Sequence, residues 1–210
     1  MIKSIILNIL EKMNKQHLLL ARKPQREKVI YITFDDGPHP ENTKEIFSIL
    51  NHFNIPATFF WVGKHIEQYQ DSIPEKFMDF HVIGNHSYNH DNYGQLKIEE
   101  IRSDIIKTES ILDRLKGAGR TKLIRFPYVK YNFKIVPILK ELNLRLVGWT
   151  YDSNDSEYKS QDSLIRFLHN QQVKNGDIVL FHEDYAHSIE ALPVFIELLK
   201  KQGFSFSSIN

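Results

Sequence analysis

Apolar positions along the chain follow two patterns: short runs rich in β-branched and aromatic residues, and longer segments with an apolar residue every three or four positions. The short runs predict strands at Val29–Phe34, Ala57–Val62, His81–Gly84, Leu123–Phe126, Leu144–Trp149, Asp177–Phe181 and Phe204–Ser207. The longer segments predict helices near Asn42–Phe53, Gly63–Gln70, Ile98–Lys116, Phe133–Leu142, Ser163–Val173 and Ser188–Lys201. Strands that alternate with helices favour a parallel sheet, either in a closed or nearly closed barrel or in a doubly wound open sheet.

The start of the chain carries a separate pattern. Apolar side chains recur there at helical spacing, with charged and polar residues between them, at Ile2, Ile5, Ile6, Ile9, Leu10 and Met13. We predict an amphipathic helix and a connector over residues 1–27, followed by a single domain over residues 28–210. The apolar stripe is expected to pack on that domain, and peripheral membrane contact through residues 1–20 is the alternative.

No signal peptide and no membrane span are predicted, because charged residues interrupt the first apolar run and no small-residue cleavage site follows it. This pattern favours a cytoplasmic or peripheral membrane location, and an extracellular one if the chain is a trimmed form.

Composition narrows the function classes. The chain has 210 residues, of which 41% are hydrophobic, so it can bury a sizeable core. Its net charge of +1 provides no global field toward a polyanion, and no nucleic-acid partner is expected. Because it has no cysteine, it can form neither a disulfide nor a thiolate nucleophile, and any metal must be bound by histidine, aspartate or glutamate.

Two polar clusters follow predicted strands. Asp35 and Asp36 come at the end of the first strand, directly before a Gly-Pro turn. Adjacent strand residues point to opposite faces, so two such aspartates can serve one site only where the backbone turns. His86 and His90 follow the third strand, four residues apart. Taken singly, these are a solvated turn and a chance pair, but two histidines and one aspartate together form a ligand set that leaves a position open for water.

Three further clusters follow later strands, at Arg125-Phe126-Pro127-Tyr128, Trp149-Thr150-Tyr151-Asp152-Ser153-Asn154-Asp155 and Val179-Leu180-Phe181-His182-Glu183. Each has an ordinary interpretation when taken alone: Arg125 as a rim charge, Asp152 and Asp155 as loop caps, and His182 as a packing residue. A parallel α/β fold collects its reactive residues at the carboxyl ends of its strands. Five clusters at five strand ends therefore predict one shared active site.

In this order the clusters resemble the motifs of the polysaccharide deacetylases, which share the NodB homology domain and form carbohydrate esterase family 4. The resemblance runs from Val29 to about Phe206. It implies that residues 28–210 form a distorted (β/α) barrel with about seven parallel strands. It also implies a divalent metal, usually zinc, and hydrolysis of an acetyl group on a carbohydrate.

Carried over motif by motif, the resemblance implies that Asp36, His86 and His90 bind the metal. Ligand type would also accept Co²⁺ or Ni²⁺. Asp35 is then the general base, and Arg125 pairs with it and keeps it ionised. Amide hydrolysis is slow because water is a weak nucleophile and the amide carbonyl a weak electrophile. A zinc ion lowers the pKa of its bound water to about 7 and polarises the carbonyl, and so helps with both.

On the opposite side of the site, the resemblance implies His182 as the general acid that protonates the leaving amine. A carboxylate bonded to this histidine would fix its tautomer and favour the imidazolium; Asp155 is the first choice for this partner and Asp152 the second. The expected substrate-binding residues are Tyr128, through its main-chain N–H, Leu180 beside the acetyl methyl, Pro127 and Trp149. Leu180 also has an ordinary interpretation as a core leucine.

Three positions depart from the family's motifs. Ser156 stands where a tryptophan usually follows the fourth motif, Val129 where the third often continues with glycine, and Glu183 where aspartate is frequent in the fifth. None of the three removes a ligand, the base or the acid. They bear on the substrate more than on catalysis.

The leading hypothesis is therefore a metal-dependent deacetylase that hydrolyses N-acetyl groups of an amino-sugar-containing polysaccharide, a cell-envelope glycan or its precursor. An O-acetyl esterase acting on a polysaccharide is an alternative, since the same chemistry cleaves esters more easily. A third possibility is an enzyme that deacylates a lipid-linked or nucleotide-linked sugar. A catalytically inactive barrel that only binds glycans is the alternative from a different class.

Overall fold

The computed structural model describes residues 19–20, 22–23, 26–73, 79–115, 119–129 and 133–210. The amphipathic helix predicted near the start of the chain lies outside these residues. In the described part of the chain, no helix is both long and apolar enough to cross a membrane.

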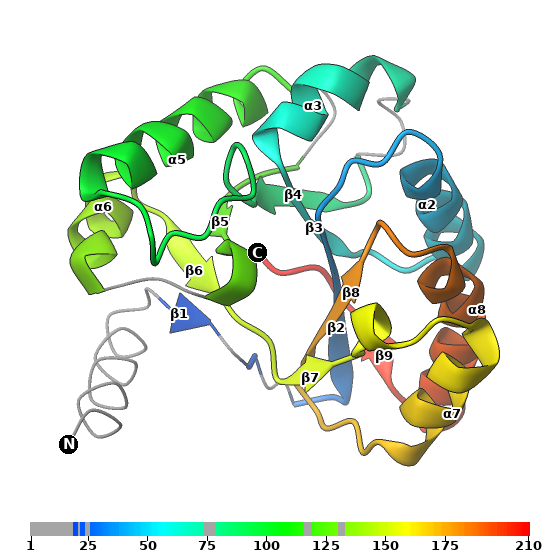
Figure 1. The fold of residues 1–210 in the computed structure, drawn as a ribbon. Coiled ribbons are helices and arrows are strands. Elements are labelled where there is room, and N and C mark those ends of the chain that lie inside the picture. Colours follow the sequence, from blue (N-terminus) through cyan, green and yellow to red (C-terminus); the bar gives the residue numbers. More distant parts are fainter. Residues whose placement is uncertain (1–18, 21, 24–25, 74–78, 116–118, 130–132) are drawn as a thin grey trace.

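A curled parallel sheet forms the centre of the molecule (Figure 1). Its strands are β1 (Leu19–Leu20), β2 (Val29–Asp35), β3 (Thr58–Trp61), β4 (Val82–Asn85), β5 (Gly119–Ile124), β6 (Arg145–Val147), β7 (Tyr151–Asp152), β8 (Ile178–His182) and β9 (Ser205–Phe206). They lie side by side in the order β1-β6-β5-β4-β3-β2-β8-β7, with β9 paired to β2. All of these pairings are parallel, which confirms the predicted distorted (β/α) barrel.

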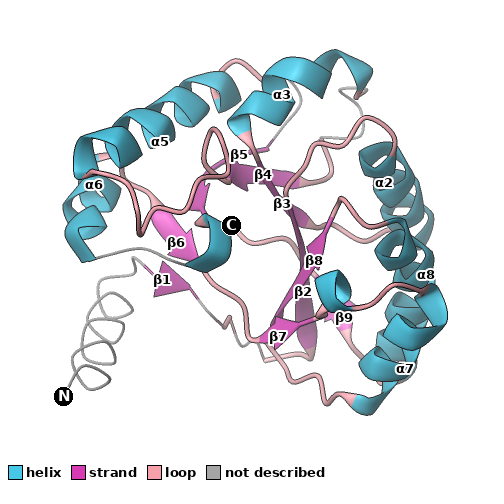
Figure 2. Cartoon of the chain, in the orientation of Figure 1, coloured by secondary structure: helices cyan, strands magenta, loops and turns pink. Residues whose placement is uncertain are grey.

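Helices cover the outer side of this sheet (Figure 2). They are α2 (Asn42–Phe53), α3 (Gly63–Tyr69), α5 (Ile98–Leu112), α6 (Val136–Glu141), α7 (Gln161–Asn170) and α8 (Ala186–Lys201). Helix α5 illustrates why they form: Ile101, Ile105 and Leu112 recur on one face and are buried. At its start the Glu100 carboxylate accepts a hydrogen bond from the Lys97 N–H (2.7 Å), which satisfies a main-chain donor of the first turn.

The structure corrects several predicted boundaries. The strand expected over Leu144–Trp149 ends at Val147, so Trp149 lies in a loop. The helix expected over Phe133–Leu142 begins with a 3₁₀ turn, and its α-helical part is only Val136–Glu141. Strands β1 and β7, of two residues each, lie outside the predicted strands.

The central strand β2 determines where the chemistry can lie. All seven of its residues are buried, as expected of a strand covered on both faces. Phe34 stacks on Phe59 of β3 and on Phe181 of β8, at ring distances of 5.0 and 6.0 Å. Register then pairs Asp35 with His182 across β2 and β8, so polar residues at the strand ends face the same edge of the sheet.

A buried histidine directly before β4 should make the fold sensitive to acid. His81 stacks on Phe47 (4.8 Å), accepts a hydrogen bond from the Ala57 N–H (3.2 Å), and leaves its buried Nε2 without a hydrogen bond. Burial lowers its pKa from 6.5 to about 4. The unfolded chain therefore binds this proton more tightly, and stability is lost as the pH falls from 6.5 toward 4.

We expect the free energy of unfolding, measured in urea, to fall between pH 7.5 and pH 5. The fall should be about 2 kcal/mol larger in the wild type than in His81→Phe. Identical pH dependence in the two proteins would contradict this assignment.

Candidate active site

The end of β2 supplies two carboxylates to one site. Asp35 is the last residue of the strand, and Asp36 has a left-handed backbone with φ 73°. This turn breaks the strand alternation, so that both side chains reach the same pocket, as the sequence predicted. Burial would raise the pKa of Asp36, but the neighbouring imidazoles of His86 and His90 hold it well below its usual range. Asp36 is therefore ionised.

The two histidines lie on a tightly turned loop after β4. Ser87 and His90 both have positive φ angles, 68° and 62°, which are uncommon for residues other than glycine. Side chains within the loop stabilise this backbone: Asn85 accepts a hydrogen bond from the Ser87 N–H (2.8 Å), and the Ser87 hydroxyl accepts one from the His90 N–H (2.9 Å). The loop thereby turns His90 back toward His86.

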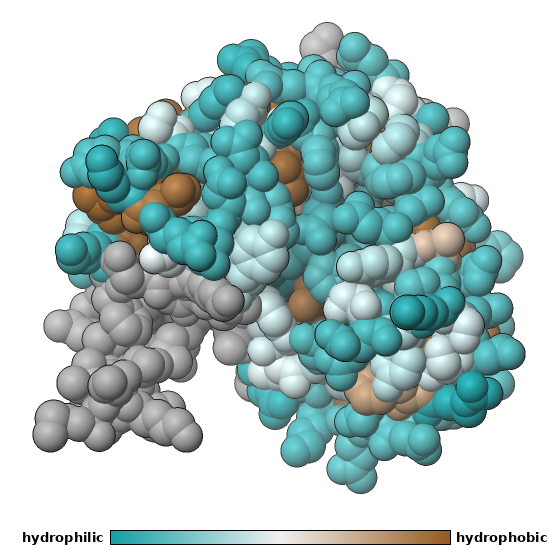
Figure 3. Space-filling view, in the orientation of Figure 1, coloured by the Kyte–Doolittle hydropathy of each residue, from teal (hydrophilic) through white to brown (hydrophobic). Residues whose placement is uncertain are grey.

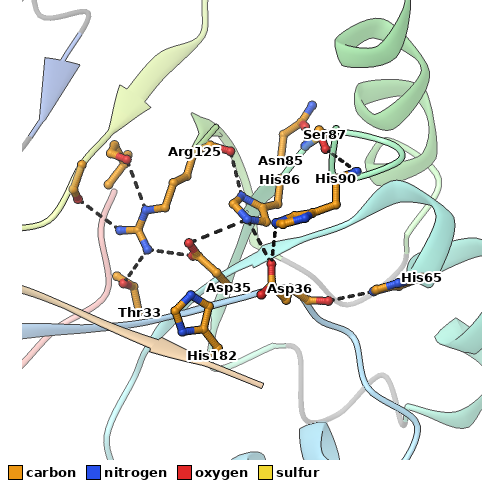
Figure 4. A network of polar contacts seen from close by, with 12 residues as sticks. Thr33, Asp35, Asp36, His65, Asn85, His86, Ser87, His90, Arg125 and His182 are labelled. Atoms are coloured by element: carbon orange, nitrogen blue, oxygen red, sulfur yellow. Dashed lines mark hydrogen bonds and ion pairs between the residues drawn. The ribbon is translucent and has the colours of Figure 1, made fainter. Parts of the chain in front are cut away.

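Asp36, His86 and His90 meet at one point (Figure 4). Oδ1 of Asp36 lies 3.2 Å from Nε2 of His86 and 3.0 Å from Nε2 of His90, and the three possible ligand atoms all lie within 4.8 Å of one another. Nδ1 of His86 lies 2.8 Å from the Arg125 carbonyl oxygen, which can only accept, so Nδ1 carries a proton and Nε2 is the ring nitrogen turned toward Asp36. Oδ1 of Asp36 is buried and has no hydrogen-bond partner among the described residues. A divalent cation fits this donor set.

Asp35 is held by a buried arginine. Arg125 Nη1 donates to Asp35 Oδ1 (2.7 Å) and to the Thr33 hydroxyl (2.8 Å), and Nε donates to the Val147 carbonyl (3.2 Å). Arg125 and Asp35 are 1% and 3% exposed. The other oxygen of Asp35 lies 3.8 Å from Nε2 of His86, toward the three possible ligands. The guanidinium therefore orients the carboxylate with one oxygen left for the reaction.

Replacing this arginine should affect the rate more than metal binding. In Arg125→Leu the buried Asp35 loses its counter-ion, at a stability cost of about 3–5 kcal/mol. We expect kcat to fall at least about 100-fold and zinc affinity to change less than about tenfold, because the Arg125 carbonyl that orients His86 remains. Arg125→Lys, which keeps the charge, should fall in between. An equal loss of zinc affinity and rate, measured by titration and kinetics on the same samples, would contradict this role.

The structure distinguishes the two aspartates considered as partners of His182. Asp155 is fully buried and its Oδ1 lies 2.7 Å from Nδ1 of His182. Its Oδ2 accepts hydrogen bonds from the His182 N–H (2.8 Å) and the Ser188 hydroxyl (2.9 Å). Asp152 instead accepts from the Asn154 N–H (2.8 Å) and from Trp149 Nε1 (3.1 Å). Asp152 is thus a loop-stabilising residue, and Asp155 is the partner of His182.

Burial alone would lower the pKa of His182. The hydrogen bond and charge of Asp155, together with the charges of Asp35 and Asp36, raise it to about 9. The imidazole is therefore protonated at neutral pH, the state required of a general acid.

Asp35, Asp36, His86, His90 and His182 line one pocket of about 480 Å³, and Arg125 and Asp155 are not among its lining residues. It opens on a largely hydrophilic face of the molecule, which is hollowed near its centre (Figure 3). The lining residues are Asp35, Asp36, His86, His90, Phe126, Tyr128, Trp149, Asp152, Asn154, Ser156, Glu157, Leu180, His182 and Tyr185. Three of the expected substrate-binding residues, Tyr128, Leu180 and Trp149, are among them. Pro127 is not, and lies in the 3₁₀ turn Pro127–Val129 beside the pocket.

The sequence and the fold are similar to those of known proteins. A profile described as "Polysaccharide deacetylase" matches residues 22–147. The chain belongs to the polysaccharide deacetylase family. It is 30% identical to a chitooligosaccharide deacetylase of Azorhizobium caulinodans, over 90% of this chain and 96% of that one. It is 33% identical to a peptidoglycan-N-acetylglucosamine deacetylase of Bacillus cereus, over 89% of this chain and 68% of that one.

Solved structures of polysaccharide deacetylases share the fold. The Bc1960 peptidoglycan N-acetylglucosamine deacetylase, in complex with an N-hydroxybenzamide, superposes with a TM-score of 0.85 at 31% identity, covering 95% of this chain and 94% of that one. A carbohydrate esterase family 4 pseudoenzyme from Bacillus anthracis superposes with a TM-score of 0.82 at 26% identity, covering 92% of this chain and 68% of that one. Because the family includes a pseudoenzyme, membership alone does not establish activity.

Several residues that line the pocket were not among the expected substrate-binding residues. Asn154, Glu157 and Tyr185 lie in the loops after β7 and β8, where no periodicity marks a residue as pocket-lining. Ser156, expected as a departure from the family's motifs, lines the pocket, as does Trp149 from the neighbouring loop. The wall near the fourth motif thus combines a serine with a tryptophan that precedes the motif.

Proposed function

We propose that this chain is a metal-dependent deacetylase that hydrolyses the N-acetyl groups of an amino-sugar-containing glycan. The observation that carries the proposal is one pocket containing three converging ligands, Asp36, His86 and His90, between an arginine-paired carboxylate, Asp35, and a protonated histidine, His182. The two relatives described above are named as deacetylases of chitooligosaccharide and of peptidoglycan N-acetylglucosamine, which supports this substrate class.

Each residue has a distinct role in this proposal. A divalent metal, most simply Zn²⁺, would be held by the three ligands and would acidify water and polarise the acetyl carbonyl. Asp35 accepts the proton of the attacking water through the oxygen that Arg125 leaves free. The main-chain N–H of Tyr128, a residue whose ring packs against His90, contributes to stabilising the oxyanion.

Collapse of the tetrahedral intermediate requires a proton on the leaving nitrogen. His182 donates it from its Nε2, since Nδ1 is bonded to Asp155. One C–N bond breaks, the acetyl group leaves as acetate, and the sugar retains a free amine. Leu180, buried on β8 and exposed only to the pocket, offers an apolar contact for the acetyl methyl.

Metal removal tests the first element of this proposal. Treatment with a chelator should lower acetate release at least about 100-fold, and stoichiometric Zn²⁺ should restore it. His90→Gln should weaken zinc binding and activity together, because it removes one ligand. His169→Gln, at an exposed histidine of α7, is the matched control and should behave as wild type. Full activity after metal removal, verified by elemental analysis, would refute metal dependence.

A substrate panel tests the glycan assignment. Zinc-loaded protein is assayed with N-acetylglucosamine oligomers, peptidoglycan fragments, acetylated xylan and a lipid-linked N-acetyl sugar. We expect release from N-acetylated glycans. Preference for acetylated xylan would instead identify an O-acetyl esterase, and binding of oligomers without any release would identify an inactive barrel.

A further inference from the structure

One buried carboxyl beside the proposed acid has no part in this mechanism. Glu183 follows His182 directly, is fully buried and does not line the pocket. Its Oε1 accepts a hydrogen bond from Trp61 Nε1 (2.8 Å), and the Thr43 hydroxyl bonds its Oε2. Because Trp61 lies on β3 and Thr43 on α2, this single carboxyl joins the end of β8 to two other elements.

The same carboxyl fills the space beside Gly37, in the turn that follows Asp36. A methyl group built on Gly37 would lie 1.9 Å from Oε1 and 2.2 Å from Cδ of Glu183. The main chain of Glu183 also makes hydrogen bonds. Its N–H donates to the carbonyl of Asp35 (3.1 Å), and its carbonyl accepts from Nδ2 of Asn42, at the start of α2 (2.7 Å). Glu183 therefore contacts the Asp35–Gly37 segment through both main chain and side chain.

We propose that Glu183 is a positioning residue that fixes the turn carrying Asp35 and Asp36 relative to His182. The end of β2 carries the base and one metal ligand, and the end of β8 carries the acid. Glu183 follows the end of β8 and packs against the turn at the end of β2. Since displacement of a reacting group by about 1 Å can lower a rate about 100-fold, the length of this side chain should matter.

Two substitutions separate shape from charge. Burial raises the pKa of Glu183 to about 8, although the hydrogen bonds from Thr43 and Trp61 act to lower it. The carboxyl is therefore largely neutral at pH 7, and glutamine is its closest mimic. We expect Glu183→Gln to keep kcat and zinc affinity within about threefold. Glu183→Asp, shorter by one methylene, cannot reach both Trp61 and the space beside Gly37. It should lower kcat about 30-fold and zinc affinity about tenfold, with KM within about twofold because the residue does not line the pocket.

The matched control is Asp177→Asn. Asp177 is also buried, next to the opposite end of β8, and accepts hydrogen bonds from the Thr150 hydroxyl (2.8 Å), the Lys174 N–H (2.6 Å) and Arg22. Its replacement should lower the thermal unfolding temperature but leave kcat and zinc affinity unchanged. Unchanged kcat and zinc affinity in Glu183→Asp, or equal losses in Glu183→Gln and Glu183→Asp, would overturn the proposal.

A double-mutant cycle tests the contact itself. Gly37→Ala places a methyl group where the carboxyl lies, and Glu183→Ala vacates that space. We expect the loss of zinc affinity in the double variant to be at least about fivefold smaller than the product of the single losses. If the loss of zinc affinity in the double variant equals the product of the single losses, the proposed contact is wrong. The inference rests on the proposed hydrolysis, but zinc titration keeps the two apart: without acetate release by wild type, the hydrolysis fails while the titrations still decide the positioning role.

Discussion

Asp35→Asn is expected to lower kcat for acetate release by about 10²–10⁴-fold, the range that a general base contributes, while zinc affinity stays within about threefold. The amide keeps the shape of the side chain but has no lone pair basic enough to take a proton from water. Asp35 is not among the three converging ligands, so metal binding should survive the change. Acetate release and zinc titration on the same protein measure both quantities.

Asp152→Asn is the matched control for this experiment. Asp152 also lines the pocket, but its oxygens bond the Asn154 N–H and Trp149 Nε1. Its replacement should therefore change kcat by less than about threefold. Equal losses in the two variants would show that the pocket responds to negative charge in general rather than to a base at Asp35.

His182→Gln should be nearly as damaging, with a kcat loss of about 10²–10⁴-fold, because glutamine cannot protonate the leaving amine. The pH profile of the wild type tests the same role. His182 has a pKa raised to about 9, so an acid at this position is protonated below pH 9 and loses its proton above it. The rate should therefore decline on the basic side near pH 9.

Asp155→Asn should move this decline of the rate, the basic limb of the pH profile, toward lower pH. Without the charge of Asp155, the pKa of His182 falls and less imidazolium is present at neutral pH. We expect a shift of at least about two pH units in kcat/KM. Glu157→Gln, which removes a carboxylate that lines the pocket without a hydrogen bond to His182, should shift the limb by less than about half a unit. A limb that stays at pH 9 in Asp155→Asn would contradict the pairing.

The sequence predicted the elements whose periodicity is strong. Strand β2 is an uninterrupted buried run between turn residues, and α5 repeats an apolar residue every third or fourth position. The clusters after the strands could be placed together because parallel strands end at one edge of a sheet. The sequence thus predicts one shared site for Asp35, Asp36, His86, His90 and His182, and in the structure all five line one pocket.

Where the backbone is irregular, the sequence does not predict which side chain faces the site. Asp152 and Asp155 stand three residues apart in a segment without periodicity. Only the two-residue strand β7 and the 3₁₀ turn Asp155–Glu157 direct Asp155 inward to His182. The burial of Glu183 depends on Gly37, a residue far away in the sequence whose lack of a side chain leaves the space. Such contacts follow from how loops meet, which local patterns do not encode.

The central claim is hydrolysis of an N-acetyl group, and its most direct measurement is the joint yield of acetate and free amine from N-acetylglucosamine oligomers incubated with zinc-loaded protein. The account predicts both products in equal amounts from wild type and a rate at least about 100-fold lower from Asp35→Asn. Acetate without amine would indicate ester cleavage, and neither product from zinc-loaded wild type on any N-acetylated glycan would contradict the account.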